Sequence, residues 1–385
     1  MKNRSWYMGY LVNFLAMACH MASTLLSVHW KQAGFEDGQI GSLAATFSMA
    51  AIASRLGLGY GLERWGRKPF LILGAALLTL LVGVYPYLGN NFSYWLLVRL
   101  LQGVGLGCYI TAILTWVADR SPPDKIGQLQ GVFGVSGLVG SAFGPWAAER
   151  VYLQAGFPTM FDVLIAGGIV CCLLVCLLPE TRKKSSLAQR ELDGKFAISA
   201  HLAVLVVSLP FGWFVGTLMT FIAPFLDSID LPKVGVYFAS FGMASVGVRI
   251  FGSRLLDQLE PARLVLMSGT LLSLSALSIA SLSFYPSLKI IVLAALLNGV
   301  GHGFLFPGLS ALTVRQSSDS QRGSALAFFT GSFDVGILAG ALVSGYLSQW
   351  LDYSATFALS SGLLLLSLPA FVGLNKKRPK APLAP

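Results

Sequence analysis

Charged residues are scarce in this sequence. Asp, Glu, Lys and Arg together make up 11% of the 385 residues, about half the share found in ordinary soluble domains. Apolar residues make up 55%, so a soluble fold would lack the polar side chains needed to cover its surface. The excess of apolar side chains must therefore be accommodated by lipid.

The signatures of soluble enzymes and of bound cofactors are also missing. There is no Gly-rich phosphate loop with a Lys-Ser/Thr ending. The five cysteines all lie in apolar runs, which gives neither a disulfide framework nor metal-ligand spacing. The net charge of +10 is spread between apolar runs and forms no basic stripe. We therefore expect no catalytic residue, no cofactor, no metal and no nucleic-acid partner.

What the sequence does contain is a series of apolar runs close to 20 residues long, the length that spans a hydrocarbon core. The first run begins near Tyr7 and is too long for a signal-peptide core, so we expect it to be retained. The fold class predicted is an all-α membrane protein. Twelve spans are predicted, near residues 7–29, 38–62, 69–89, 92–117, 126–148, 160–178, 198–224, 234–256, 264–284, 289–314, 323–349 and 354–374.

The basic residues predict the orientation of these spans. With the N-terminus in the cytoplasm, 20 of the 27 Lys and Arg residues lie in inner segments and only 4 in outer segments. Positive residues concentrate on the cytoplasmic side of membrane proteins. We therefore expect both termini to be cytoplasmic and the chain to be a multi-pass protein of the plasma membrane, in a bacterium the inner membrane.

The chain divides into two related halves of six spans each. The predicted parts are a first half at 1–178, a hydrophilic cytoplasmic linker at 179–197, a second half at 198–374 and a basic tail at 375–385. The halves repeat at a near-constant offset, which is typical of transporters whose site lies between two repeats. The matched positions are Arg55 and Arg249, Glu63 and Asp257, Gln102 and Asn298, and the glycine pairs 103/299, 105/301, 107/303, 127/323, 140/336 and 144/340.

The segment after the second span carries the first specific motif, GYGLERWGRK at residues 59–68. It resembles the loop signature of the major facilitator superfamily, Gly-x-x-x-Asp-Arg-x-Gly-Arg-Lys, with Glu63 in place of Asp. A plain positive-inside loop would explain the basic residues but not Glu63 and Gly66. The resemblance implies a twelve-span fold of two pseudo-symmetric halves, and a cytoplasmic latch in which Glu63 and Arg67 pair with Asp119 at the end of span four.

Span four contains Arg99, Gln102, Gly103 and Gly105, similar to the family's Arg-x-x-Gln-Gly-x-Gly motif. A guanidinium within an apolar span is costly and should face the protein interior or water. In related exporters this Arg is associated with proton coupling, and the resemblance assigns that role to Arg99. The alternatives are that Arg99 binds an anionic group of the substrate or holds the span in place structurally.

Span five contains glycines with the spacing of the family's antiporter signature, at Gly131, Gly140 and Gly144, followed by Pro145. Glycines allow close helix approach, and Pro145 permits a kink that can serve in gating. This feature favours export over import. Ala148 and Glu149 replace the terminal Gly-Gly of the signature, and small-residue packing alone would explain the remaining positions.

Asp334 is a carboxylic acid in span eleven where the repeat partner in span five is apolar. A buried carboxyl must be neutralised or protonated, and a group that changes charge with water access suits proton coupling. A fixed ion pair, with Arg249 for example, is the alternative.

Other polar residues lie in the spans that line the central cavity of this fold. Histidine titrates near neutral pH, so His302 is a candidate proton relay beside Arg99 and Asp334. A packing role is the alternative for each histidine. The expected cavity residues are Asn13, His20, Gln102, Trp213, Phe214, Asn298 and His302.

We expect a secondary active transporter that exports a small organic molecule in exchange for protons by alternating access, as a monomer in the lipid bilayer. A proton symporter that imports a small organic solute is the nearest alternative. A lipid flippase or a transporter-like sensor is a different class, and the sensor is less favoured because no added soluble domain is present.

Overall fold

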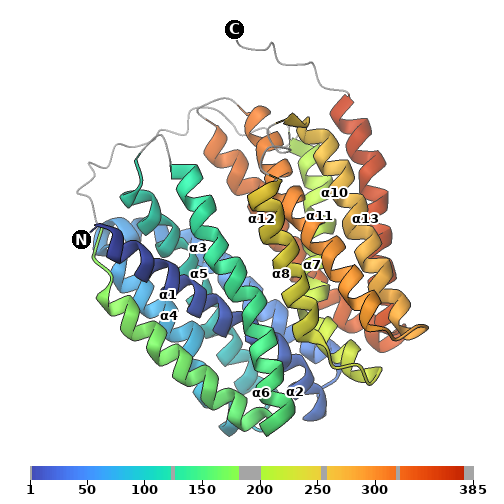
Figure 1. The fold of residues 1–385 in the computed structure, drawn as a ribbon, viewed down its shortest axis with the longest axis horizontal. Helices are drawn as coiled ribbons and strands as arrows, with labels where there is room; N and C mark the ends of the chain where they lie inside the picture. The colour runs from blue at the N-terminus through green and yellow to red at the C-terminus, as the bar shows by residue number, and fades with distance from the viewer. Residues whose placement is uncertain (1, 123–125, 182–200, 253–257, 318–320, 377–385) are drawn as a thin grey trace. The chain divides into compact units, whose positions relative to one another are not determined.

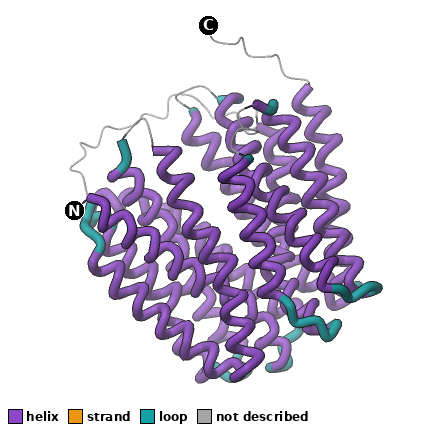
Figure 2. The backbone as a smooth tube through the Cα atoms, viewed as in Figure 1, coloured by secondary structure: helices purple, strands orange, loops and turns teal. Residues whose placement is uncertain are grey.

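The computed structural model describes residues 2–122, 126–181, 201–252, 258–317 and 321–376, and within these ranges every regular element is a helix (Figures 1 and 2). The all-α prediction is confirmed. A helix satisfies its own backbone hydrogen bonds, which lipid cannot do. Most of the predicted linker and tail, from residues 182 and 377 onward, lie outside these ranges.

The first half of the sequence forms six helical passages. Two of their starts are capped by side chains: Glu36 and Gln39 form a capping box at α3, and Asn91 accepts hydrogen bonds from the backbone N–H groups at the start of α5. The elements are α1 (Lys2–Ala22), η1 (Ser23–Leu25), α2 (Leu26–Gln32), α3 (Asp37–Trp65), α4 (Lys68–Thr79), η2 (Leu80–Tyr87), α5 (Phe92–Arg120) and α6 (Ile126–Leu177).

The helix α6 contains two of the predicted spans. Its backbone is helical except at Gly156, where φ is 77° and ψ is 177°. A positive φ is readily adopted only by glycine, and here it lets the chain reverse direction between two arms (Figure 1). Each arm is long enough to cross a hydrocarbon core.

The second half has the same succession of passages. Its elements are α7 (Leu202–Ser228), α8 (Val234–Phe251), α10 (Pro261–Ala280), η5 (Ser281–Ser283), α11 (Leu288–Arg315), α12 (Arg322–Trp350) and α13 (Tyr353–Lys376). Among the described residues ten helices are long and apolar enough to cross a membrane, and the bent α3 is an eleventh. The reversal at Gly156 divides α6 into two passages, which brings the number to twelve.

The chain forms two compact units. Unit 1 comprises Met1–Ala188 and Ile222–Gly242, and unit 2 comprises Gln189–Phe221 and Met243–Pro385. The division near residue 188 falls within the predicted linker. The end of α7 and the first part of α8 belong to unit 1 although they follow the linker in sequence.

The sequence repeat is visible as matched helix contacts inside each unit. Gly140 of α6 lies against the backbone carbonyl of Phe14 in α1, and its repeat partner Gly336 of α12 lies against the carbonyl of Leu209 in α7. In both cases the missing Cβ allows two helix backbones to touch. The same relationship recurs one turn further on, between Gly144 and Ala18 and between Gly340 and Trp213.

Candidate functional site

A buried arginine lies inside unit 1, two turns into α5. Arg99 is only 7% exposed. Its guanidinium carbon lies 4.3 Å from the ring centre of Phe47 in α3 and 5.7 Å from that of Trp30 in α2. Aromatic faces attract a cation through the ring quadrupole, and more strongly where water is excluded. Two rings from other helices therefore hold the charge of Arg99 within an apolar span.

The polar neighbours of Arg99 are equally buried. Arg99 Nη1 donates a hydrogen bond to Gln102 Oε1 at 3.2 Å. The hydroxyl of Tyr85 in η2 lies 2.9 Å from the same oxygen and 2.6 Å from Gln102 Nε2. Tyr85 and Gln102 are each 2% exposed. Tyr85 thus fixes the amide of Gln102 with its oxygen toward the guanidinium.

Arg99 has no carboxylate partner among the residues that the structure describes. The ion pairs found there join Lys31 to Asp37 and Arg67 to Asp119. Within the same residues, Arg99 Nε is buried and donates no hydrogen bond. A buried charge without a counter-ion is costly, and neutralising it is favourable. An anionic group beside Arg99 would therefore be electrostatically favourable.

His20 of α1 is close to this arginine. The imidazole stacks on the ring of Phe47 with centroids 5.2 Å apart and an interplanar angle of 16°, and Phe47 also contacts Arg99. His20 and Arg99 thus contact one aromatic ring, that of Phe47, and Gln102 joins them through its hydrogen bond to Arg99. Asn13 has a different role: its amide bonds Ser136 of α6 at 3.0 Å and the Tyr109 hydroxyl of α5 at 3.4 Å.

The expected residues of the second half lie in unit 2. The ring of His302 in α11 contacts that of Phe211 at 5.3 Å, and Phe211 also contacts Phe333 at 4.7 Å. Asp334, the next residue in α12, is partly buried. His302 and the turn that carries Asp334 are thus both built around Phe211.

The remaining three residues differ in how much surface they offer. Asn298 in α11 is 1% exposed and Phe214 in α7 has no exposed surface. Trp213 is partly exposed, and its indole N–H has no hydrogen-bond acceptor among the described residues. Of the three, Trp213 has the most exposed surface, and its indole N–H could donate a hydrogen bond to a ligand.

The glycines of the antiporter-like motif are divided between packing and open space. Gly140 and Gly144 touch α1, as their repeat partners touch α7, whereas no atom of another residue would meet a Cβ at Gly131. The helix also continues through Pro145 without a break. Because the second half uses the same glycine contacts, helix packing is sufficient to explain these positions.

The predicted latch residues lie at the ends of helices in unit 1. Arg67 Nε donates to Asp119 Oδ2 at 2.7 Å. Glu180, just after α6, accepts from the backbone N–H groups of Arg67 at 2.9 Å and Lys68 at 3.0 Å. Its carboxylate thus caps the start of α4, where a negative charge is favoured. Arg67, Asp119 and Glu180 form one cluster, the Arg67 cluster. Glu63 is exposed and lies outside it in the described residues.

A second carboxylate caps the start of α8. Glu149, at the end of the first arm of α6, accepts hydrogen bonds from the backbone N–H groups of Val234 at 2.6 Å and Gly235 at 2.9 Å. It is 6% exposed. The bonds satisfy two N–H groups that have no partner within the helix. Glu149 thus joins two segments that the linker separates in sequence.

Tyr85, Phe47 and Trp30 are neighbours of Arg99 that the sequence does not predict, because no local pattern signals a ring contributed by another helix. The motif comparison marks Glu149 only as a departure from the antiporter signature, and Glu180 stands out in no motif described above. A single acidic residue just beyond an apolar run was the available signal for both. In the described parts of the chain, no group of three or more His, Cys, Asp or Glu residues could hold a metal ion.

The chain is similar to known transporters over nearly its whole length. It is 27% identical over 341 residues to the multidrug resistance protein MdtG of Citrobacter koseri and 26% identical over 342 residues to that of Salmonella heidelberg, in each case with 84% of this chain and 81% of the relative covered. Among solved structures, the nucleoside transporter NupG has a TM-score of 0.78 at 15% identity, with 97% of this chain and 100% of NupG covered.

A second solved structure has the same fold. The xylose transporter XylE from E. coli, in an inward open conformation, has a TM-score of 0.73 at 14% identity, with 99% of this chain and 96% of XylE covered. The model of the Major Facilitator Superfamily matches residues 6–288 and 261–385. This multi-pass membrane protein therefore belongs to the Major Facilitator Superfamily.

Proposed function

We propose that the protein is a proton-coupled efflux transporter for a small organic molecule, placed in a bacterial inner membrane with both termini in the cytoplasm. The observation that carries the proposal is the buried charge of Arg99, held by Phe47 and Trp30 and without a carboxylate partner in the described residues. Relatives named multidrug resistance proteins support export.

The coupling residues in this proposal are Arg99 and Asp334. Arg99 keeps a fixed positive charge, which favours an anionic group nearby and disfavours a second cation. Asp334 can take up a proton and release it as water access changes during alternating access. His302, within its aromatic cluster, is the proposed relay. The ligand chemistry that fits the Arg99 site is an aromatic or apolar body with one acidic group.

Proton symport is the second candidate function. One observation keeps it in consideration: Gly140 and Gly144 of the antiporter-like motif are matched by equivalent contacts in α12, so these glycines do not distinguish export from import.

Measurement of the lumenal pH of proteoliposomes distinguishes proton antiport from proton symport. A thermal-shift screen of purified protein first identifies a solute that binds. The solute is then added outside vesicles loaded with a fluorescent pH indicator. Antiport makes the lumen alkaline, because protons leave as the solute enters, whereas symport makes it acidic. If the solute enters and the lumenal pH does not move, proton coupling is wrong.

Two variants locate the coupling. Asp334→Asn is expected to abolish the pH change while retaining solute binding, and Arg99→Gln is expected to lose binding of an acidic solute. Parent-like pH changes in Asp334→Asn would remove Asp334 from the mechanism without affecting the assignment as a transporter.

A further inference from the structure

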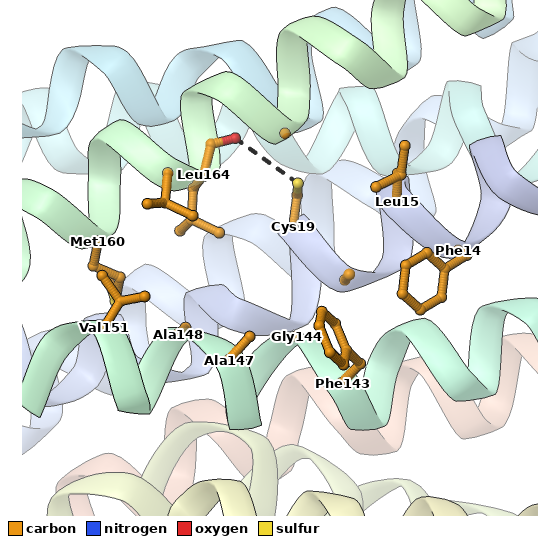
Figure 3. Close-up of a pocket in the computed structure, with 13 residues that line it drawn as sticks. Phe14, Leu15, Cys19, Phe143, Gly144, Ala147, Ala148, Val151, Met160 and Leu164 are labelled. Carbon is orange, nitrogen blue, oxygen red and sulfur yellow. Dashed lines mark hydrogen bonds between the residues drawn. The ribbon is translucent and has the colours of Figure 1, made fainter.

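An apolar cavity of about 190 Å³ lies in unit 1, between α1 and the two arms of α6. Small residues on three sides create it: Ala18 and Cys19 from α1, Ala147 and Ala148 from the first arm, and Gly167 from the second (Figure 3). Larger apolar side chains, such as those of Phe143 and Leu164, surround this hollow.

The cavity has almost no hydrogen-bonding groups for a water molecule. Among the lining side chains the Cys19 thiol is the one polar group, and its sulfur lies 3.8 Å from the backbone carbonyl of Leu164, to which it donates (Figure 3). A buried water needs two to four polar partners. Apolar cavities of roughly 150 Å³ stay dry and bind molecules such as benzene. The occupant that suits this cavity is therefore hydrocarbon.

The cavity continues into a surface that faces lipid. Val163, on its edge, is 51% exposed, and the same arm of α6 presents Val170, Leu173 and Leu177, which are 48%, 63% and 66% exposed. Large exposed apolar side chains along a membrane span are stable only against lipid chains. The lining residues of α6 are all within 13 residues of the Gly156 reversal, or ~20 Å at the helical rise. The cavity is thus open to the hydrocarbon of one leaflet.

We propose that this cavity binds the end of a phospholipid acyl chain from the adjacent leaflet. The head group stays outside, because no charged or amide side chain lines the cavity. The volume admits a terminal part of one chain and not a whole lipid. The bound chain completes the packing between α1 and the two arms of α6, where the small side chains leave a gap.

Photo-crosslinking in phosphatidylcholine vesicles tests this assignment. One probe carries a diazirine near the end of an acyl chain, and a second carries it on the head group. With the chain probe, crosslinks are expected to concentrate on residues 14–19, 143–151 and 160–167 relative to the lipid-facing residues 170–177. The head-group probe should leave the cavity residues unlabelled.

Ala147→Phe fills the cavity with a ring and is expected to abolish these crosslinks while leaving those at 170–177 unchanged. Ala166→Phe is the matched control, because Ala166 lies on the second arm next to Gly167 but is exposed and does not line the cavity. Its labelling should equal that of the parent. Val151→Phe is a second filling variant in case Ala147→Phe does not fold, and thermal unfolding checks all three.

Equal chain-probe labelling of the cavity and of residues 170–177 would overturn the proposal, as would persistence of cavity crosslinks in both folded filling variants. Labelling of the cavity by the head-group probe would overturn it too. Displacement of the chain probe by a transported solute would assign the cavity to the solute instead.

Discussion

The carboxylate of Glu149 accepts a hydrogen bond from the backbone N–H of Val234 at 2.6 Å. The residues are 85 positions apart, on opposite sides of the linker. A charged acceptor makes a stronger hydrogen bond than a neutral one, and its charge is further stabilised by the N-terminus of α8.

Replacing Glu149 with Gln is therefore expected to loosen the start of α8. Hydrogen bonds to charged groups contribute about 1.5–3 kcal/mol against roughly 1 for neutral ones, so a loss of ~1–2 kcal/mol should speed amide exchange at Val234 and Gly235 by roughly 5- to 30-fold. Hydrogen exchange measures this directly. Asp162→Asn removes one charge from an exposed position on the second arm of α6 and should change neither amide; equal effects of both variants would contradict the assignment.

Substitution of Arg99 separates a functional charge from a structural one. The two roles predict opposite changes in stability, because a buried cation without a carboxylate costs free energy that an apolar side chain of similar length does not. Arg99→Met should retain or raise the thermal midpoint while abolishing transport, whereas Arg99→Lys should keep the charge but lose the stacked guanidinium geometry. A large fall in the midpoint of Arg99→Met would show that the arginine mainly pins α5.

The glycine contacts predict a matched pair of stability changes. Gly140→Ala should be destabilising by about 1–3 kcal/mol, because its Cβ would press on the backbone carbonyl of Phe14. Gly336→Ala should cost a similar amount in the second half. Gly131→Ala, where a Cβ meets no neighbour, should be neutral or gain up to about 1 kcal/mol. Thermal unfolding in detergent is the measurement, and equal losses at Gly131 and Gly140 would refute the packing explanation.

The Arg67 cluster predicts a difference between two glutamates. Glu180→Gln should weaken the cap on α4 and increase amide exchange at Arg67 and Lys68 by roughly tenfold. Glu63→Gln should leave these amides unchanged, because substitutions of exposed residues usually alter stability by less than about 0.5 kcal/mol. A parent-like exchange rate in Glu180→Gln would place the hydrogen bonds elsewhere.

Much of the architecture follows from the sequence because length and repetition are properties of the chain itself. Apolar runs of about 20 residues predict spans, and the all-α class and the family fold are confirmed. The apolar runs near 126–148 and 160–178 predict two separate spans. The structure places the turn between them at Gly156. An apolar run bounded by Gly and Pro is a local signal, so it can be recognised without tertiary information.

The surroundings of the candidate site could not be predicted in the same way. Arg99 attracts attention because a charge inside an apolar run is conspicuous. Its partners Phe47 and Trp30 are ordinary apolar residues of other spans, and only helix packing brings them to the guanidinium. The roles of Glu149 and Glu180 could not be predicted for a related reason. A carboxylate that caps another helix can be recognised only when the start of that helix is seen beside it.

Glu180, which caps the start of α4, belongs to a larger junction of helix ends. Its neighbour Thr181 also donates a hydrogen bond to Asp119, at 2.9 Å, so the chain is fastened at two successive residues immediately before it continues toward the second half. Glu180 binds the start of α4, and Thr181 binds Asp119 near the end of α5. The two residues that follow α6 therefore join the ends of three helices within unit 1.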